Sequence, residues 1–296
     1  MANQKTRQQR RATERERGER LTSQPRKQAK QQRNPMLLAV GGIVGLLVVI
    51  GALVGAKLLQ SSPAPAKKTG LAPASVVHDV STVPAKTFDT IGAVSGLGGM
   101  TKIGGTPLKE GGKPLVIYVG AEYCPFCAAE RWPLVAALSR FGTFTNLGAT
   151  HSATNDVYPN TPTFSFKDAK FKSKYLALQT VELYGNRPVN GQYPPIESPT
   201  PLERDLLKAN DPKGTIPFIY FGRYGINGAT YDAQLLAGLT MSQVAAAARD
   251  PSSEIGHSVL GASNLITAAI CKQTGGQPAN VCSSSGVVAA AKHLPS

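Results

Sequence analysis

The sequence predicts an α/β domain with a mixed sheet flanked by helices, preceded by one N-terminal transmembrane helix. Two apolar runs of β-forming residues, 113–120 and 214–222, predict strands, and the first should be central and covered on both faces. Helical patterns follow the first run directly and also close the chain. An uncharged apolar stretch, 36–56, would as a helix match the thickness of a bilayer core.

The region before the domain divides into an arm and a membrane span. Residues 1–35 contain eleven Lys or Arg and three Glu but few apolar residues, so they are expected to be disordered. The transmembrane helix is expected at residues 36–58. Because the basic flank precedes it, the arm should be cytoplasmic, against anionic lipid, and the rest extracytoplasmic. The net charge of +14 is concentrated before the domain, which argues against nucleic-acid binding.

Two further features bear on this anchor. A cleaved signal peptide is the competing interpretation, with Ala64-Pro65-Ala66 as a small-residue cleavage site, but the apolar run is longer than a signal peptide requires. The span also contains glycines at the spacing that lets two helices pack closely, which is a weak indication of a homodimer. These pairs are Gly41 with Gly45 and Gly51 with Gly55.

The folded domain is expected at residues 85–296, after a linker and lead-in segment at 59–84. Proline and small residues dominate the linker. Val76-Val77 and Val80 are interpreted as edge-strand residues. The glycine-rich segment 92–112 is expected to consist mostly of turns.

Within the domain, the strand at 113–120 leads into a helix that begins at Cys124 and contains Pro133, which must bend its axis. Three strand-like runs and then a loop are expected at residues 144–150, 163–166, 174–183 and 185–199.

Capping signals predict the remaining helices. Thr200-Pro201-Leu202-Glu203 combines an N-cap, a first-turn proline and a capping-box glutamate, and predicts a helix that ends near Asn210. Three helices should close the chain, beginning after Thr240, Asp250 and Gln277.

The motif Tyr123-Cys124-Pro125-Phe126-Cys127 lies where the first predicted strand meets the first predicted helix. Unpaired N–H groups and the positive dipole end at a helix N-terminus stabilise a thiolate, so Cys124 should be nucleophilic near neutral pH. Cys127 would then resolve the mixed disulfide that Cys124 forms. Two cysteines at this spacing and place indicate a redox motif.

This order of elements resembles the thioredoxin fold, with Thr215-Ile216-Pro217 where that fold keeps its cis-proline loop. Over residues 85–296 the chain resembles more closely a group of membrane-anchored, thioredoxin-like proteins of bacteria and archaea known as a domain of unknown function. The stretches 156–166 and 266–271 carry that closer resemblance. The broader resemblance is to DsbA-like thiol oxidases and glutaredoxins.

The resemblance implies that Cys124 is the exposed nucleophile and Cys127 the more buried thiol. It also implies that Pro217 is cis and places the backbone of Ile216 beside the disulfide, where an extended substrate can pair with it. Pro125 and Phe126 would tune the redox poise. The sequence departs from thioredoxin in these two residues, in a tyrosine before the first cysteine, and in an insertion before the cis-proline strand that leaves substrate specificity open.

Several neighbouring charges have alternative interpretations. Glu122 could raise the pKa of the Cys124 thiol or relay a proton, or it could be a solvated surface carboxylate. Glu130 and Arg131 are expected on a solvated face, and Trp132 in the core.

The cysteines themselves also have alternatives to a redox role. Cys124 and Cys127 could form half of a zinc site. However, Cys271 and Cys282 are eleven residues apart and do not supply the other half, and the four histidines are scattered, so no metal is expected. Outside the cytoplasm, Cys271 and Cys282 should form a structural disulfide contributing about 2–3 kcal/mol. A shuttle pair that relays electrons to Cys124 and Cys127 is the alternative.

The sequence thus predicts a membrane-tethered, extracytoplasmic thiol–disulfide oxidoreductase of oxidase or isomerase type. It would act on cysteines of exported proteins without a bound cofactor, and a membrane redox partner would reset it. A non-catalytic envelope scaffold with a structural disulfide at the motif is the alternative. A cytoplasmic-facing reductant is a third, which the charge asymmetry disfavours.

Overall fold

The computed structural model describes residues 70–296. The predicted arm (1–35), the transmembrane helix (36–58) and most of the linker lie outside the described residues, as do the cleavage site and the glycine pairs of the span. Within the described part of the chain, no helix combines the length and apolar character needed to cross a membrane.

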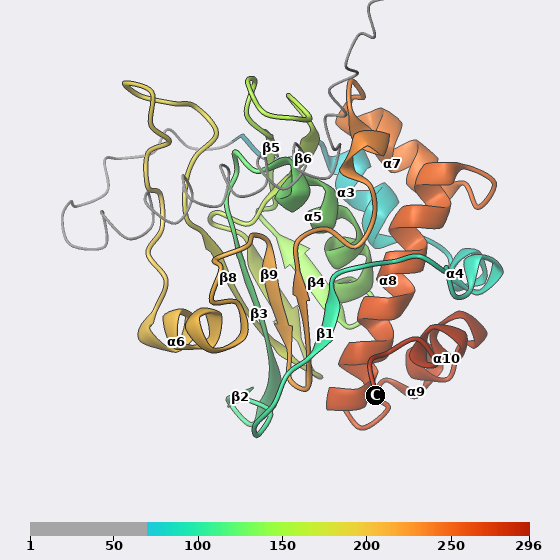
Figure 1. Cartoon of the computed structure of the whole chain (residues 1–296). Helices are drawn as coiled ribbons and strands as arrows, with labels where there is room; N and C mark the ends of the chain where they lie inside the picture. The colour runs from blue at the N-terminus through green and yellow to red at the C-terminus, as the bar shows by residue number, and fades with distance from the viewer. Residues whose placement is uncertain (1–69) are drawn as a thin grey trace, which may run out of the picture. The chain divides into compact units, whose positions relative to one another are not determined.

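A six-stranded mixed sheet forms the centre of the described region (Figure 1). Its order is β1-β10-β9-β3, with β8 and the short β2 paired to the other side of β3. β3 runs parallel to β8 and antiparallel to β9. The strands are β1 (Met100–Lys102), β2 (Lys109–Glu110), β3 (Lys113–Gly120), β8 (Ala177–Glu182), β9 (Phe218–Phe221) and β10 (Tyr224–Asn227).

Both predicted strands are confirmed, the second in shortened form. β3 has the predicted bounds. β9 begins only at Phe218, because Pro217 has no N–H to donate to the ladder. Gly222 adopts a left-handed φ of 67°, which turns the chain back into β10, a strand that the sequence pattern did not indicate.

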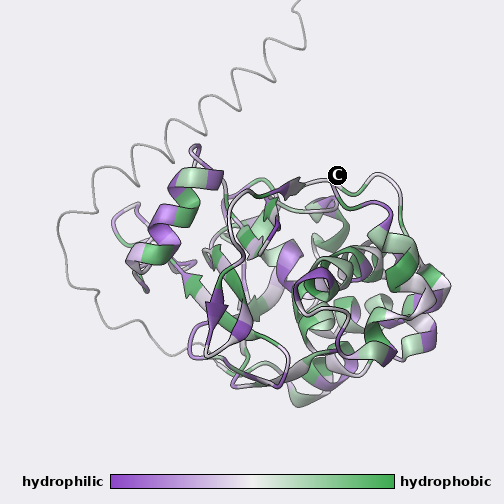
Figure 2. Ribbon diagram, turned by 90° about the horizontal axis from the view of Figure 1, so that it is seen from below, coloured by the Kyte–Doolittle hydropathy of each residue, from purple (hydrophilic) through white to green (hydrophobic). Residues whose placement is uncertain are grey.

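Helices cover both faces of the sheet because alternate residues of β3 point to opposite sides. Val116 and Tyr118 join the larger core with α5 and α8, whereas Ile117 and its alternate neighbours join a smaller core with α6. α6 carries both hydrophilic and hydrophobic residues (Figure 2), and its partly buried Leu206 and Leu207 pack against the smaller core. These helices are α5 (Pro125–Leu138), α6 (Pro201–Asn210) and α8 (Glu254–Gln273).

Two small antiparallel pairs lie between α5 and β8. The predicted run 144–150 is split, because Asn146 adopts a left-handed φ of 60° that interrupts the strand. The pairs are β4 (Gly142–Thr145) with β7 (Lys170–Ser173), and β5 (Gly148–His151) with β6 (Pro162–Ser165).

The edge-strand interpretation of the valines before the domain was wrong. Val76 and Val80 are buried on one face of helix α3 (Ala74–Ser81), because a four-residue spacing matches a helical turn. α3 packs against α5, and α4 (Ala85–Ile91) packs against α8. The packed region therefore begins ahead of residue 85.

The capping predictions agree with the structure. Thr200 and Thr240 each complete a capping box, at the starts of α6 and α7 (Met241–Arg249). α8 begins a few residues later than predicted, with Ser253 as its N-cap. A short 3-10 helix, η1 (Ala233–Leu236), precedes α7. The prediction of three closing helices was one short, because the last predicted helix divides into α9 (Ala279–Cys282) and α10 (Ser285–Ala291), with Ser284 as the N-cap of α10.

Candidate active site

The CxxC motif lies at the start of α5, directly after β3. Cys124 is the N-cap residue, and its Sγ accepts a hydrogen bond from the Cys127 backbone N–H at 3.3 Å. Pro125 occupies the first helical turn, where its missing N–H leaves no donor unpaired. The Cys124 N–H donates to the carbonyl of Ala121 at 3.3 Å, which closes the turn between strand and helix.

The two thiols are not disulfide-bonded to each other, and both are buried. Cys124 is only 5 % exposed and Cys127 0 %. The relative order of burial agrees with prediction, but the expectation of an exposed nucleophile was wrong. The reason is the segment opposite, because the Cys124 Sγ–H lies against the carbonyl oxygen of Ile216 at 3.7 Å.

Ile216 and Pro217 are brought beside the motif from a position 92 residues along the chain from Cys124. The peptide bond between them is cis, as the resemblance implies. Gly228 N–H donates to the Pro217 carbonyl at 2.8 Å, which ties this loop to the end of β10. The loop therefore presents backbone groups at the thiol, as a substrate-pairing segment would require.

The two thiols differ in proton affinity. Burial raises the pKa of Cys124, but hydrogen bonds from the Cys127 side chain and backbone, together with the Arg131 charge, outweigh it, so the pKa is lowered. Burial also raises the pKa of Cys127, and its hydrogen bond to Cys124 and the charge there raise it well above the ordinary value. Cys124 is thus the thiol that ionises first, as a nucleophile requires.

Glu122 is buried, so its interpretation as a solvated surface carboxylate was wrong. Its Oε1 accepts a hydrogen bond from the Ser165 hydroxyl at 2.6 Å, and its backbone N–H donates to the Tyr184 carbonyl at 2.8 Å. These contacts fix the turn just before Cys124 to β6 and to the end of β8.

The solvated face predicted for Glu130 and Arg131 was also wrong, because both side chains are completely buried. Arg131 forms a two-point ion pair with Glu182 of β8, and Glu130 accepts two hydrogen bonds from Thr230. Glu130 and Arg131 thus do not pair with each other but bind different partners across the core. Trp132 is buried as predicted.

Sequence reasoning missed Glu182 as part of this site. One signal was Glu182 itself, a lone carboxylate at the end of an apolar strand pattern. The other was Arg131, which follows Cys127 by four residues and so lies on the same face of the predicted helix. A charge in such a strand needs a buried partner, because an unpaired buried charge is costly.

Aromatic side chains surround the motif on two sides and were also missed. Tyr193 stacks on Tyr123 with ring centroids 4.4 Å apart, and its hydroxyl donates to Asn155 Oδ1 at 2.8 Å. Phe126, which is 37 % exposed, meets Tyr158 edge to face at 6.0 Å. These partners lie in the segment 154–162 and in the predicted loop 185–199.

The second cysteine pair lies apart from the motif. Cys271 and Cys282 are at disulfide distance, with 1.98 Å between sulfurs, as predicted. A Cβ atom at Gly222 would touch Gln273, so this end of α8 lies at the end of β9 opposite Ile216. Four residues of strand span about 13 Å, which is too far for direct exchange with Cys124.

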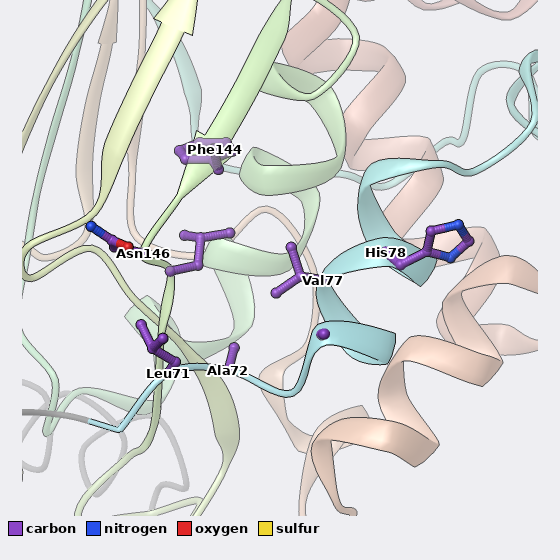
Figure 3. A pocket seen from close by; sticks show the side chains of 8 residues that line it. Leu71, Ala72, Val77, His78, Phe144 and Asn146 are labelled. Carbon is purple, nitrogen blue, oxygen red and sulfur yellow. The ribbon is translucent and has the colours of Figure 1, made fainter.

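Other features of residues 70–296 add no chemistry to the site. That region contains no group of three or more His, Cys, Asp or Glu arranged to hold a metal ion. A pocket of about 330 Å³ lies beside α3, where mostly apolar side chains such as Leu71, Val77 and Phe144 line it (Figure 3). None of the predicted site residues lines this pocket.

Comparison with known protein families gives a match over part of the chain. Residues 99–197 match the family described as "Domain of unknown function (DUF929)". This segment contains β3, the CxxC motif, α5 and β8, and ends before the Ile216–Pro217 loop. No match was found among curated proteins or among solved structures.

Proposed function

We propose that this chain is a thioredoxin-like, membrane-tethered thiol–disulfide oxidoreductase that acts on cysteines of exported proteins. The sheet supports the thioredoxin-like assignment, since its strand order β10-β9-β3-β8 has β8 parallel and β9 antiparallel to β3. The small strands β4–β7 and the segment with α6 are then insertions before the cis-proline strand.

One observation carries the proposal. Cys124 caps α5, accepts the Cys127 N–H, and lies 3.7 Å from the carbonyl of Ile216 in a cis-proline loop. An incoming sulfur thus meets a thiol that is stabilised as thiolate and a backbone edge that can align an extended substrate.

The reaction follows from the two thiols. In the oxidised protein, a substrate thiolate attacks Cys124 Sγ, forming a mixed disulfide and releasing Cys127 as thiolate, which takes up a proton. A second substrate thiolate attacks the substrate sulfur and releases Cys124. The substrate has then lost two electrons and gained a disulfide, and the chain holds a dithiol that a disulfide-class oxidant must reoxidise.

The location rests on the sequence. The apolar stretch before the domain, with its basic N-terminal flank, supports a single-pass anchor that leaves the domain outside the cytoplasm. Disulfides persist outside the cytoplasm, and the Cys271–Cys282 pair supports this location. A reporter fused after Ser296 should be active outside the cytoplasm, and a reporter active only in the cytoplasm would overturn the topology.

Trapping of the mixed disulfide tests the function. The full chain with Cys127→Ser is mixed with a reduced, unfolded protein in the presence of oxidised glutathione, and mass spectrometry locates any covalent adduct. We expect a substrate adduct at Cys124 that Cys124→Ser abolishes. An adduct that persists in Cys124→Ser would move the site elsewhere. Absence of any adduct would favour the scaffold alternative, in which the motif is a structural disulfide.

A further inference from the structure

A buried guanidinium group lies beneath the CxxC motif. Arg131 follows Cys127 by four residues on α5, a spacing that places both side chains on one face of the helix. Its Nε and Nη2 donate to the two carboxylate oxygens of Glu182, at 2.9 Å and 2.6 Å. Glu182 Oε1 also accepts the Phe166 N–H at 3.2 Å. Arg131 is therefore held in one orientation.

The same guanidinium contacts the turn that positions the nucleophile. Arg131 Nη2 donates to the Ala121 carbonyl at 2.9 Å, and this carbonyl also accepts the Cys124 N–H at 3.3 Å. One carbonyl oxygen thus connects the guanidinium to the backbone of Cys124. If Arg131 were removed, the carbonyl would keep only the longer of its two hydrogen bonds.

One nitrogen of the Arg131 guanidinium lies outside its ion pair with Glu182. Its Nη1 has no acceptor within residues 70–296, and its Cζ lies 5.6 Å from the centre of the Tyr118 ring. The other titratable groups facing it are few. Burial raises the pKa of Tyr118 well above the ordinary value, so it stays neutral, and the carboxylate of Glu182 supplies the opposing negative charge. Burial raises the pKa of Glu130, the adjacent residue, to about 8.

We infer that Arg131 is a positioning residue that sets the Cys124 backbone through Ala121 and stabilises the Cys124 thiolate. The inference rests on the proposed function and gives a physical reason for its direction of electron flow, from substrate thiols to the motif. A stabilised thiolate favours the dithiol form of the motif, so the chain accepts electrons from substrate thiols and acts as an oxidant. The Arg131 charge is also among the influences that lower the pKa values of both thiols.

The test removes both charges of the pair together, because an unpaired buried charge would itself destabilise the fold. Arg131→Met with Glu182→Gln keeps similar volumes, and the amide oxygen introduced at position 182 can still accept the Phe166 N–H. Arg140→Met is the matched control. Arg140 lies just beyond α5 and donates to Asn264 and other residues away from the thiols.

The readout is alkylation of Cys124 in the reduced full chain, followed by mass spectrometry across pH. We expect the double variant to react about tenfold more slowly than wild type at acidic pH, which corresponds to a pKa higher by about one. The same variant should shift its equilibrium with glutathione about tenfold toward the disulfide form. Arg140→Met should match wild type in both measurements.

An unchanged pH profile in the folded double variant would overturn the inference. Arg131→Lys is the second variant, because it keeps the charge but cannot contact Glu182 and Ala121 as a planar fork. It should lie between wild type and the double variant, and a profile identical to wild type would refute the positioning role. Failure of both variants to fold would also overturn the inference, since it would assign the pair to the fold alone. Turnover is not needed for these measurements, so failure of the proposed function would be seen separately.

Discussion

Glu130 provides a prediction about stability that follows from burial. Its side chain is completely buried on α5, and its Oε2 accepts hydrogen bonds from the Thr230 N–H and hydroxyl, each at 2.8 Å. Burial raises the pKa of this carboxyl from 4.5 to about 8, although the Thr230 hydrogen bonds oppose the rise. Glu130 is therefore mostly protonated in the folded protein at neutral pH.

The sign of the effect follows from proton binding. Between pH 4.5 and 8 the folded state holds the Glu130 proton and the unfolded state has lost it, so stability falls as pH rises through this window. From pH 5 to 7.5 the loss is about 3 kcal/mol, at about 1.4 kcal/mol for each pH unit. Glu130→Gln has the same shape, can accept both Thr230 hydrogen bonds and does not titrate.

Urea denaturation of the full chain at pH 5 and pH 7.5 measures this effect. The free energy of unfolding of Glu130→Gln, relative to wild type, should rise by about 3 kcal/mol between the two pH values. Glu110→Gln, at an exposed position in β2, is the control and should keep the wild-type pH dependence. Equal pH dependence in wild type and Glu130→Gln would refute the reasoning.

Three further predictions concern packing and the disulfide. Cys271→Ala with Cys282→Ala should lower the free energy of unfolding by about 2–3 kcal/mol, and a concurrent change in Cys124 alkylation would contradict the separation of the two pairs. Trp132→Ala should cost about 3–5 kcal/mol in urea denaturation because the side chain is fully buried; a cost under about 1 kcal/mol would contradict its core placement. Gly120→Ala should cost about 1–3 kcal/mol, because the new Cβ would overlap the Tyr118 hydroxyl, and wild-type stability would contradict that contact.

Local sequence signals predicted the parts of the fold that local interactions determine. The continuous apolar run predicted β3 to the residue, since both faces of a central strand need apolar side chains. The capping box at Thr200 likewise predicted the start of α6, because its hydrogen bonds join residues three apart. The valines of α3 were wrongly predicted as strand residues, because two buried residues four apart on a short helix resemble a brief apolar strand.

The sequence predicted only part of the site, because the other contacts join residues that are far apart along the chain. The motif itself is local, but what buries Cys124 is the Ile216 carbonyl, and what pairs with Arg131 is Glu182, 51 residues away. Spacing along one chain does not reveal which acid meets which base across a sheet. The Arg131 contact with Ala121 is equally hidden, because a backbone carbonyl leaves no mark in the sequence.

The most direct test of the central claim is a single-turnover thiol balance. The oxidised full chain is mixed with a reduced, unfolded protein without any other oxidant, and thiols of both are counted by mass spectrometry. The account predicts that each substrate disulfide formed yields one Cys124–Cys127 dithiol, with Cys271 and Cys282 still bonded. Substrate thiols that remain reduced while the Cys124–Cys127 disulfide persists would contradict it.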